Sequence, residues 1–211
     1  MKTFEWFNRK DRKLRSKKKL PIRNIVSAIA ILFLQLNASF PAVHAADDKT
    51  KEVGAKELEV GDKAPEFSLQ AQDGSTVSLK DFLGKRAVVL YFYPKDDKLV
   101  CKKEACLFRD SYQQFVDHGA EVIGVSSDSL ESHKKFVAAR NLQFKLLSDR
   151  GGQVRKLYHV PRAAAGLLPG RETFVIDRDG VVRLKFNSLM DAPAHIAEAL
   201  KVLKQLESAQ N

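Results

Sequence analysis

The sequence predicts an α/β domain in which helices cover both faces of a central, mostly parallel sheet. Short apolar runs rich in β-branched and aromatic residues alternate with longer polar or amphipathic stretches, which is the pattern of repeated β–α–β units. Glycine, proline and Asp-Gly turns separate these runs. The 211 residues are enough for one domain of about 150 residues with an extension.

The first elements are a hairpin and a buried strand. Residues 67–69 and 76–79 are the arms of the hairpin, and Asp73-Gly74 is its turn. The apolar run 87–93 suits a strand buried on both faces, and Pro94 ends it because proline cannot donate to a strand ladder. A helix then begins near Leu99 and continues to the stop at 116–119.

The remaining elements repeat this alternation. A strand at 121–125 is followed by a helix that is capped near Ser129 and runs to Arg140. A strand at 144–147 and a short helix ending near His159 come next. Strands at 173–177 and 181–186 then flank the turn 178–180, and a last helix is capped by Asp191. We expect the two terminal hairpins to add antiparallel edges to the sheet. The layout is thioredoxin-like, and ligands of such sheets bind at the C-terminal ends of strands.

Cys101 falls at that position, where a strand passes into a helix. The unpaired amides and the dipole of a helix N-terminus favour a thiolate, which is the nucleophilic form of cysteine. Three lysines, Lys98, Lys102 and Lys103, act in the same direction. The alternative is a buried cysteine that serves as a small apolar side chain.

Cys106 lies five residues further along the same helix. Helix geometry separates the two Cα atoms by roughly 8–9 Å, whereas a disulfide requires less than about 7 Å. The two cysteines can therefore bridge only if the first turn unwinds, which fits a redox cycle better than a permanent crosslink. In such a cycle Cys101 is oxidised to sulfenic acid, Cys106 condenses with it, and a reductant restores both thiols.

The net charge of +10 is concentrated in the first 24 residues, which hold ten Lys or Arg but only Glu5 and Asp11 as acids. The chain after residue 45 carries a net charge of only +2, so nucleic-acid binding is not expected. The basic segment, the apolar run 25–34 and the small residues before Ala45 predict an export signal in residues 1–45. An uncleaved membrane anchor is the main alternative, and an organelle transit peptide is less favoured.

A linker is expected at 46–59 and the folded domain at 60–211. Export to the periplasm or a thylakoid lumen implies an oxidising compartment. No cofactor and no metal site are expected, since zinc needs about four clustered ligands. The histidines, expected at the surface or at helix caps, show no metal spacing: His118, His133, His159 and His195.

The chain resembles the peroxiredoxin superfamily, and within it the bacterioferritin-comigratory or Q-type branch. The resemblance covers residues 60 to about 206. It rests on seven motifs in order: GDKAPEF at 61–67, YFYPKDD at 91–97, Cys101 with EAC at 104–106, GVS at 124–126, SHKKF at 132–136, LLSD at 146–149 and RETFVID at 171–177.

The resemblance implies a monomeric thiol peroxidase that reduces hydrogen peroxide or alkyl hydroperoxides at the expense of thioredoxin or a similar dithiol. Cys101 matches the peroxidatic cysteine and Cys106 the resolving cysteine. Pro94 matches the proline that shields the site, Arg171 the arginine beside the thiolate, and Glu104 the residue that orients this arginine. The alternative for Arg171 and Glu104 is an ordinary surface ion pair.

Lys98 departs from the family pattern. The family usually has threonine three positions before the peroxidatic cysteine, followed by Pro-Gly, where this chain has Lys98-Leu99-Val100. A threonine hydroxyl can both accept and donate a hydrogen bond, whereas lysine only donates. The substitution implies a weakened or re-purposed peroxidase. Two other functions stay open: a general thiol–disulfide oxidoreductase, which normally has two cysteines separated by two residues, and a non-catalytic redox sensor or binding module.

Overall fold

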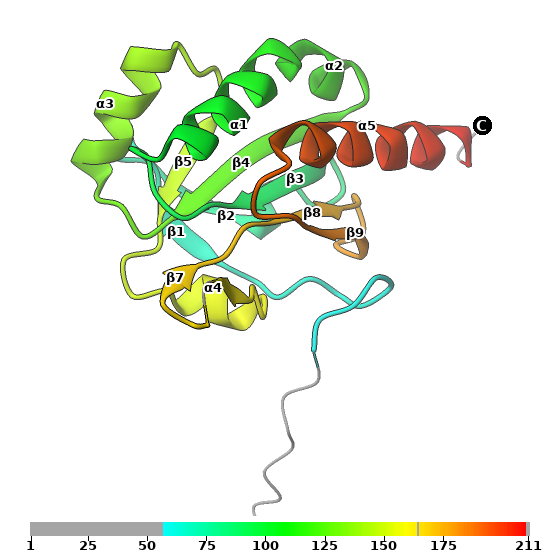
Figure 1. Ribbon diagram of the computed structural model, residues 1–211. Helices are drawn as coiled ribbons and strands as arrows, with labels where there is room; N and C mark the ends of the chain where they lie inside the picture. Colours follow the sequence, from blue (N-terminus) through cyan, green and yellow to red (C-terminus); the bar gives the residue numbers. More distant parts are fainter. Residues whose placement is uncertain (1–56, 164, 210–211) are drawn as a thin grey trace, which may run out of the picture. The chain divides into compact units, whose positions relative to one another are not determined.

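The computed structural model describes residues 57–163 and 165–209, all within one compact unit, Glu52–Asn211 (Figure 1). The predicted leader at 1–45 and most of the predicted linker at 46–59 lie outside the described residues. In the part of the chain that is described, no helix is long and apolar enough to cross a membrane.

A five-stranded sheet in the order β5-β4-β3-β8-β9 forms the centre. Its strands are β3 (Ala87–Phe92), β4 (Ala120–Ser126), β5 (Lys145–Ser148), β8 (Glu172–Ile176) and β9 (Val182–Asn187). The β3–β4 and β4–β5 pairs are parallel, and the β3–β8 and β8–β9 pairs are antiparallel. The predicted α/β class is confirmed, and the sheet is mixed because the C-terminal hairpin supplies two of its strands.

Helices cover both faces of this sheet (Figure 1). One face carries α1 (Leu99–Asp110), α2 (Tyr112–Asp117), α3 (Leu130–Arg140) and α5 (Ala192–Ser208). The other face carries α4 (Gln153–Leu157), the hairpin β1–β2 (Ser68–Gln70 and Thr76–Ser78) and the short helix η1 (Leu79–Asp81). A small ribbon, β6–β7 (Arg162–Ala163 and Leu168–Pro169), precedes β8.

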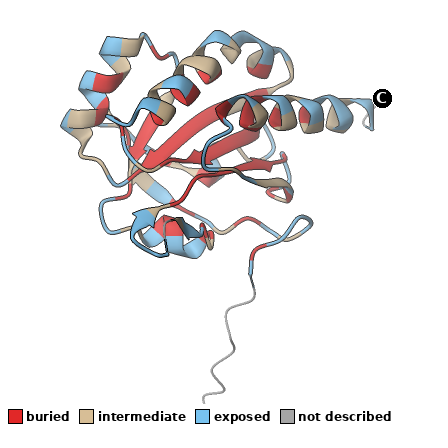
Figure 2. Cartoon of the chain, in the orientation of Figure 1, coloured by how far each residue is buried: buried red, intermediate tan, exposed pale blue. Residues whose placement is uncertain are grey.

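Strand β3 is buried along its whole length, as its sequence predicts (Figure 2). Its side chains alternate between the two faces. Val88, Leu90 and Phe92 join the core beneath α4 and the β1–β2 hairpin. Val89 and Tyr91 join the core beneath α1, α2 and α5. The strand that leads to Cys101 is thus fixed by packing on both sides.

The N-terminal hairpin differs from the prediction, because it forms its own two-stranded sheet instead of an edge of the main one. Its backbone meets the edge strand β5 through a bridge between Ala71 and Leu147 and a hydrogen bond from the Gln72 amide to the Leu146 carbonyl at 3.1 Å. The hairpin lies across the face of the sheet, where Phe67 and Val77 enter the core. Burial of these side chains turns the hairpin over the face of the sheet, although its turn still touches the edge strand β5.

The helix that carries the cysteines also differs from the prediction, because it ends at Asp110 instead of continuing to residue 117. Ser111 interrupts it with φ −99° and ψ 2°. The interruption turns α2 toward the sheet, so that Phe115 packs against Phe108 with ring centroids 5.7 Å apart. It also brings the Tyr112 hydroxyl within 2.8 Å of a Glu121 carboxylate oxygen on β4.

Candidate active site

Cys101 is the third residue of α1, and only 2% of its surface is exposed. Lys98 is the N-cap of this helix and makes no side-chain capping hydrogen bond. The amides of the first turn are therefore available to an anion beside them. The helix begins where β3 ends, as predicted, so the sulfur lies at the C-terminal end of the parallel strands.

Arg171 reaches Cys101 from the other half of the sheet. The antiparallel register of β3 and β8 ends with Phe92 opposite Glu172, which brings the residue before β8 to the end of β3. The Arg171 guanidinium donates from Nη2 to Cys101 Sγ at 3.1 Å and from Nη1 to Glu104 Oε2. Its Nε donates to the Leu189 carbonyl at 3.2 Å.

These three groups are in the interior. Arg171 is 2% exposed and Glu104 is fully buried, so their ion pair is not a surface feature. Arg171 bridges a thiol and a carboxylate, and it stabilises the charged form of each. This arrangement can hold a thiolate in a site that excludes bulk water.

A buried histidine of α5 lies beside Glu104. His195 Nδ1 is 2.8 Å from the Thr173 hydroxyl and 3.9 Å from Glu104 Oε1, while Nε2 is 2.8 Å from the Ser188 carbonyl. Burial lowers the pKa of His195. The ring is therefore neutral at pH 7, with Nε2 donating to the carbonyl and Nδ1 accepting from Thr173.

A second buried network holds the loop between β3 and α1. Asp96 accepts hydrogen bonds from the Tyr93 hydroxyl at 2.7 Å and the Ser132 hydroxyl at 2.6 Å. His133 Nδ1 lies 3.0 Å from Asp96 Oδ2, and His133 Nε2 lies 3.2 Å from the Leu147 carbonyl. Both ring nitrogens lie within hydrogen-bond distance of oxygen atoms, which fixes the orientation of the ring.

The prediction of surface or capping roles was wrong for His133 and His195, both of which are fully buried. Each ring nitrogen of these histidines meets a specific partner in the interior. The partners are far away in the sequence, such as Asp96, which is 37 residues from His133. The motifs at 91–97 and 132–136 contained these residues, but no local pattern connected them.

The other predicted site residues lie on or beside the same helix. Cys106 is partly buried on α1, and both cysteines are free thiols in an unbroken helix. Pro94 lies two residues after the end of β3 and is partly buried, whereas Lys98 is exposed. Sequence reasoning thus selected residues that the fold gathers at one end of the sheet, although it did not find Asp96, His133 or His195.

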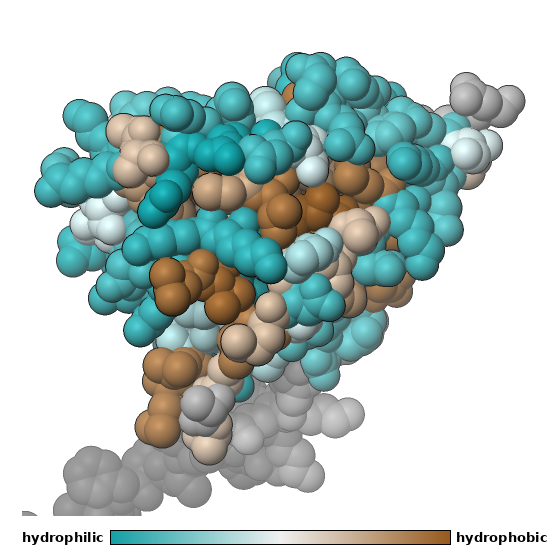
Figure 3. Space-filling view, turned by 45° about the horizontal axis from the view of Figure 1, so that its top comes forward, coloured by the Kyte–Doolittle hydropathy of each residue, from teal (hydrophilic) through white to brown (hydrophobic). Residues whose placement is uncertain are grey.

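Two exposed apolar side chains adjoin residues of the site in the chain. Leu99, two residues before Cys101, is 83% exposed, and Met190 follows the Leu189 carbonyl that binds Arg171. Figure 3 shows hydrophobic patches set among hydrophilic residues on one face of the molecule. Exposed apolar side chains such as Leu99 and Met190 can receive an apolar part of a substrate or partner.

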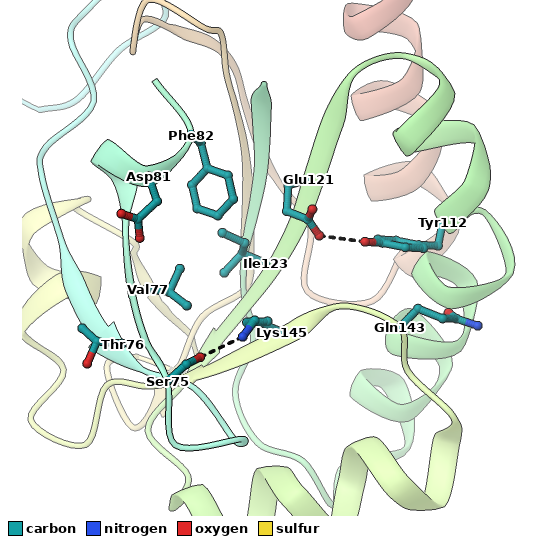
Figure 4. A pocket seen from close by; sticks show the side chains of 10 residues that line it. All are labelled: Ser75, Thr76, Val77, Asp81, Phe82, Tyr112, Glu121, Ile123, Gln143 and Lys145. Atoms are coloured by element: carbon teal, nitrogen blue, oxygen red, sulfur yellow. Dashed lines mark hydrogen bonds between the residues drawn. The ribbon is translucent and has the colours of Figure 1, made fainter. Parts of the chain in front are cut away.

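A separate cavity of about 460 Å³ lies at the opposite end of the strands (Figure 4). Its polar groups bind one another, since Tyr112 donates to Glu121, and Lys145 donates to Ser75. In the described ranges, no group of three His, Cys, Asp or Glu side chains could hold a metal ion.

A buried thiol at a helix start, bound by a guanidinium on a thioredoxin-like sheet, defines the class of thiol peroxidases. The model of the AhpC/TSA family matches residues 60–185, and the chain belongs to this family of peroxiredoxins, in its Q branch. It is therefore a peroxidase and an oxidoreductase.

Known proteins resemble this chain both in amino-acid sequence and in fold. The chain is 51% identical over 147 residues to peroxiredoxin Q, chloroplastic, of Sedum lineare, covering 70% of this chain and 78% of the relative. It is 42% identical over 191 residues to the chloroplastic peroxiredoxin Q of Populus jackii, covering 90% and 89%. The crystal structure of peroxidoxin BcpB from Mycobacterium tuberculosis aligns with TM-score 0.66 and 36% identity, covering 71% and 98%.

Proposed function

We propose that this thiol peroxidase reduces hydrogen peroxide and organic hydroperoxides with Cys101 as its peroxidatic and Cys106 as its resolving cysteine. The observation that carries the proposal is the 3.1 Å contact of Arg171 Nη2 with Cys101 Sγ inside a buried site. A guanidinium in this position favours the thiolate and can also bind a peroxide oxygen.

The cycle balances with the two cysteines and one external dithiol. The Cys101 thiolate attacks a peroxide oxygen, the O–O bond breaks, and the departing oxygen takes a proton to leave as water or an alcohol. The sulfur is then a sulfenic acid, which the Cys106 thiol attacks, so that water leaves and a disulfide forms. Thioredoxin or a similar dithiol reduces this disulfide by exchange and is itself oxidised.

The two sulfurs react only if α1 opens. Both cysteines lie in one helix, Leu99–Asp110, where five residues separate Cα atoms by roughly 8–9 Å. This separation exceeds the limit of about 7 Å for a disulfide. Unwinding of the first turns is therefore a step of the proposed cycle.

Variants of the cysteines test the assignment. Cys101→Ser should abolish peroxide consumption by the reduced protein. Cys106→Ser should consume one equivalent and stop with Cys101 as a sulfenic acid, which a dimedone adduct identifies by mass. The parent protein should instead lose two hydrogens. Peroxide consumption by Cys101→Ser at the parental rate would disprove the proposal.

Lys98→Thr tests the departure from the family pattern. The side chain at this position is exposed and makes no capping hydrogen bond, whereas threonine would cap α1 and could orient the peroxide. We expect turnover to rise by up to about 10²-fold, the range in which misplaced active-site groups cost rate. Lys103→Thr, which removes a charge without changing the N-cap, is the control.

A redox sensor is the second candidate, favoured by the missing threonine. Stopped-flow oxidation of Cys101 separates the two functions. Sulfenic acid formation at micromolar peroxide supports the peroxidase, and an inert thiol supports the sensor. If Lys98→Thr does not change a slow parental rate, the orientation argument fails.

The compartment and the assembly state are also proposals. The composition of residues 1–45 favours export, and relatives named chloroplastic agree with a thylakoid lumen more readily than with a periplasm. We expect a monomer that meets membranes only through the leader. Intact mass of the protein from its native host should correspond to cleavage after Ala45, whereas an uncleaved leader would indicate an anchor.

A further inference from the structure

Arg155 lies on the face of the sheet opposite α1, beneath the proposed site. It belongs to α4 and is 9% exposed. Its guanidinium carbon lies 5.5 Å from the centre of the Phe92 ring. Since arginine is rarely buried without a partner, its contacts require an explanation.

The guanidinium connects two main-chain carbonyls at the end of the sheet. Nη2 donates to the Tyr93 carbonyl and Nη1 to the Gly170 carbonyl, each at 2.8 Å. These carbonyls belong to the residues directly before Pro94 and Arg171. The last pair of the β3–β8 register is Phe92 opposite Glu172, so both carbonyls lie beyond the end of this ladder. Arg155 therefore joins the two strands where their own ladder has ended.

The neighbouring backbone holds this connection rigidly. Asp149 accepts from the amides of Gln153 at 2.8 Å and Arg155 at 2.9 Å, which fixes the start of α4 to the end of β5. Gly170 packs so closely on Pro161 that an added Cβ would lie 2.0 Å from the Pro161 carbonyl oxygen. The start of α4 and the Gly170 backbone that Arg155 binds are therefore each held by a further contact.

The Arg155 guanidinium binds neutral main-chain groups. Among the described residues, no carboxylate lies within ion-pair distance of its guanidinium, and its hydrogen-bond partners are the two neutral carbonyls. Burial lowers the pKa of Arg155 to about 10, while attraction to the Asp149 and Cys101 sites opposes this fall. The group stays cationic at pH 7, and Cys101 is one of the sites that its charge reaches.

We propose that Arg155 is a positioning residue of the peroxidase site, which joins the strand ends carrying Pro94 and Arg171 and adds a second positive charge that favours the Cys101 thiolate. The inference rests on the proposed role of Cys101. Arg155 would act in two ways: its hydrogen bonds to the two carbonyls fix the geometry of the strand ends, and its positive charge favours the thiolate. Substitutions can separate these effects.

The test follows alkylation of Cys101 by iodoacetamide against pH, in the full chain carrying Cys106→Ser. Arg155→Met removes both effects, and we expect the midpoint pH of alkylation to rise by about one unit. Arg155→Lys keeps the charge but cannot bridge both carbonyls in the same geometry. We expect its midpoint to stay near the parental value while its rate of oxidation by hydrogen peroxide falls about threefold or more, since geometry contributes to rate separately from charge.

Arg162→Met is the matched control. Arg162 lies near Arg155, is exposed, and donates to the Gly166 carbonyl at 2.6 Å, so this variant removes a nearby charge without breaking the connection. Far-ultraviolet circular dichroism checks that each variant is folded. If folded Arg155→Met has the alkylation midpoint of Arg162→Met, or Arg155→Lys is oxidised at the parental rate, the inference is wrong. Alkylation needs no peroxide, so an inert parent protein would refute the proposed function without affecting the midpoint comparison.

Discussion

At the scale of the residue, Asp96 illustrates how one carboxylate fixes the approach to the thiol. Its backbone amide donates to Asp128 at 3.1 Å, and its side chain accepts from Tyr93, Ser132 and His133. Burial opposes ionisation, but the hydrogen bonds, led by the one from His133, lower the pKa of Asp96 overall. The carboxylate thus ties the loop before α1 to α3.

Asp96→Asn should destabilise the fold by about 3 kcal/mol at pH 7, because it removes the buried carboxylate that binds Tyr93, Ser132 and His133. The folded-state pKa of Asp96 is lowered, so its stabilising effect is complete above the unfolded value near 3.9 and disappears as the pH falls through the folded value. Urea unfolding at pH 7 and near pH 3 measures the difference. Asp97→Asn, at the exposed neighbouring position, is the control, and equal losses in both variants would contradict the prediction.

At the scale of the element, α1 must be both ordered and able to open. Phe108 holds the C-terminal half of this helix, fully buried and stacked on Tyr91 with ring centroids 4.5 Å apart. The first turn carries no capping side chain and has Leu99 almost fully exposed. The helix is therefore anchored by packing after Cys106 and held around Cys101 by the contacts of Arg171 with Cys101 and Glu104, which the proposed cycle must release as this end unwinds.

Phe108→Leu should speed disulfide formation after Cys101 is oxidised. The substitution loosens the anchor of α1 by about 1 kcal/mol, which corresponds to about fivefold in rate if the whole effect falls on helix opening. Phe136→Leu makes the same change on α3 and should leave this rate unaltered. Rapid quench with mass detection follows the disulfide. Equal acceleration in both variants would indicate a general loss of stability rather than opening of α1.

At the scale of the whole molecule, the sheet separates two hydrophobic cores. The buried carboxyl of Glu172 makes the stability of the folded protein depend on pH. Glu172 is 1% exposed, its Oε2 has no hydrogen-bond partner, and its side chain is on the face opposite Arg171. Burial raises the pKa of Glu172 to about 7, although Lys185 opposes the rise. Between about pH 4.3 and 7 the Glu172 carboxyl is therefore protonated in the folded state, whereas in the unfolded chain it is ionised.

Glu172→Gln should make the protein more stable than the parent at pH 8 by about 2 kcal/mol. Because the raised folded pKa stabilises the parent only at low pH, parental stability falls as the pH rises from about 4 through 7. The gain of the variant should vanish below about pH 4. Thermal unfolding across this range measures it, with exposed Glu66→Gln as the control. A gain that does not change with pH would exclude titration of Glu172 as its cause.

Much of this molecule was determined locally in the sequence. The apolar run 87–93 required a strand buried on both faces, and Asp191 and Ser129 cap helices as predicted. Gly119 takes the positive φ of 65° that a helix stop requires. The position of Cys101 at a helix start also followed from local sequence, because propensity, capping and turn chemistry act over a few residues.

Tertiary structure alone decided which distant residues meet. The antiparallel register of β3 with β8 puts Arg171 beside Cys101, 70 residues away, and the turn at Ser111 follows from packing of Phe115 on Phe108. Burial of His133, His195 and Arg155 depends on partners from other elements, because a polar group enters the interior only where its hydrogen bonds are supplied. Those partners are far apart in the chain and adjacent only after folding.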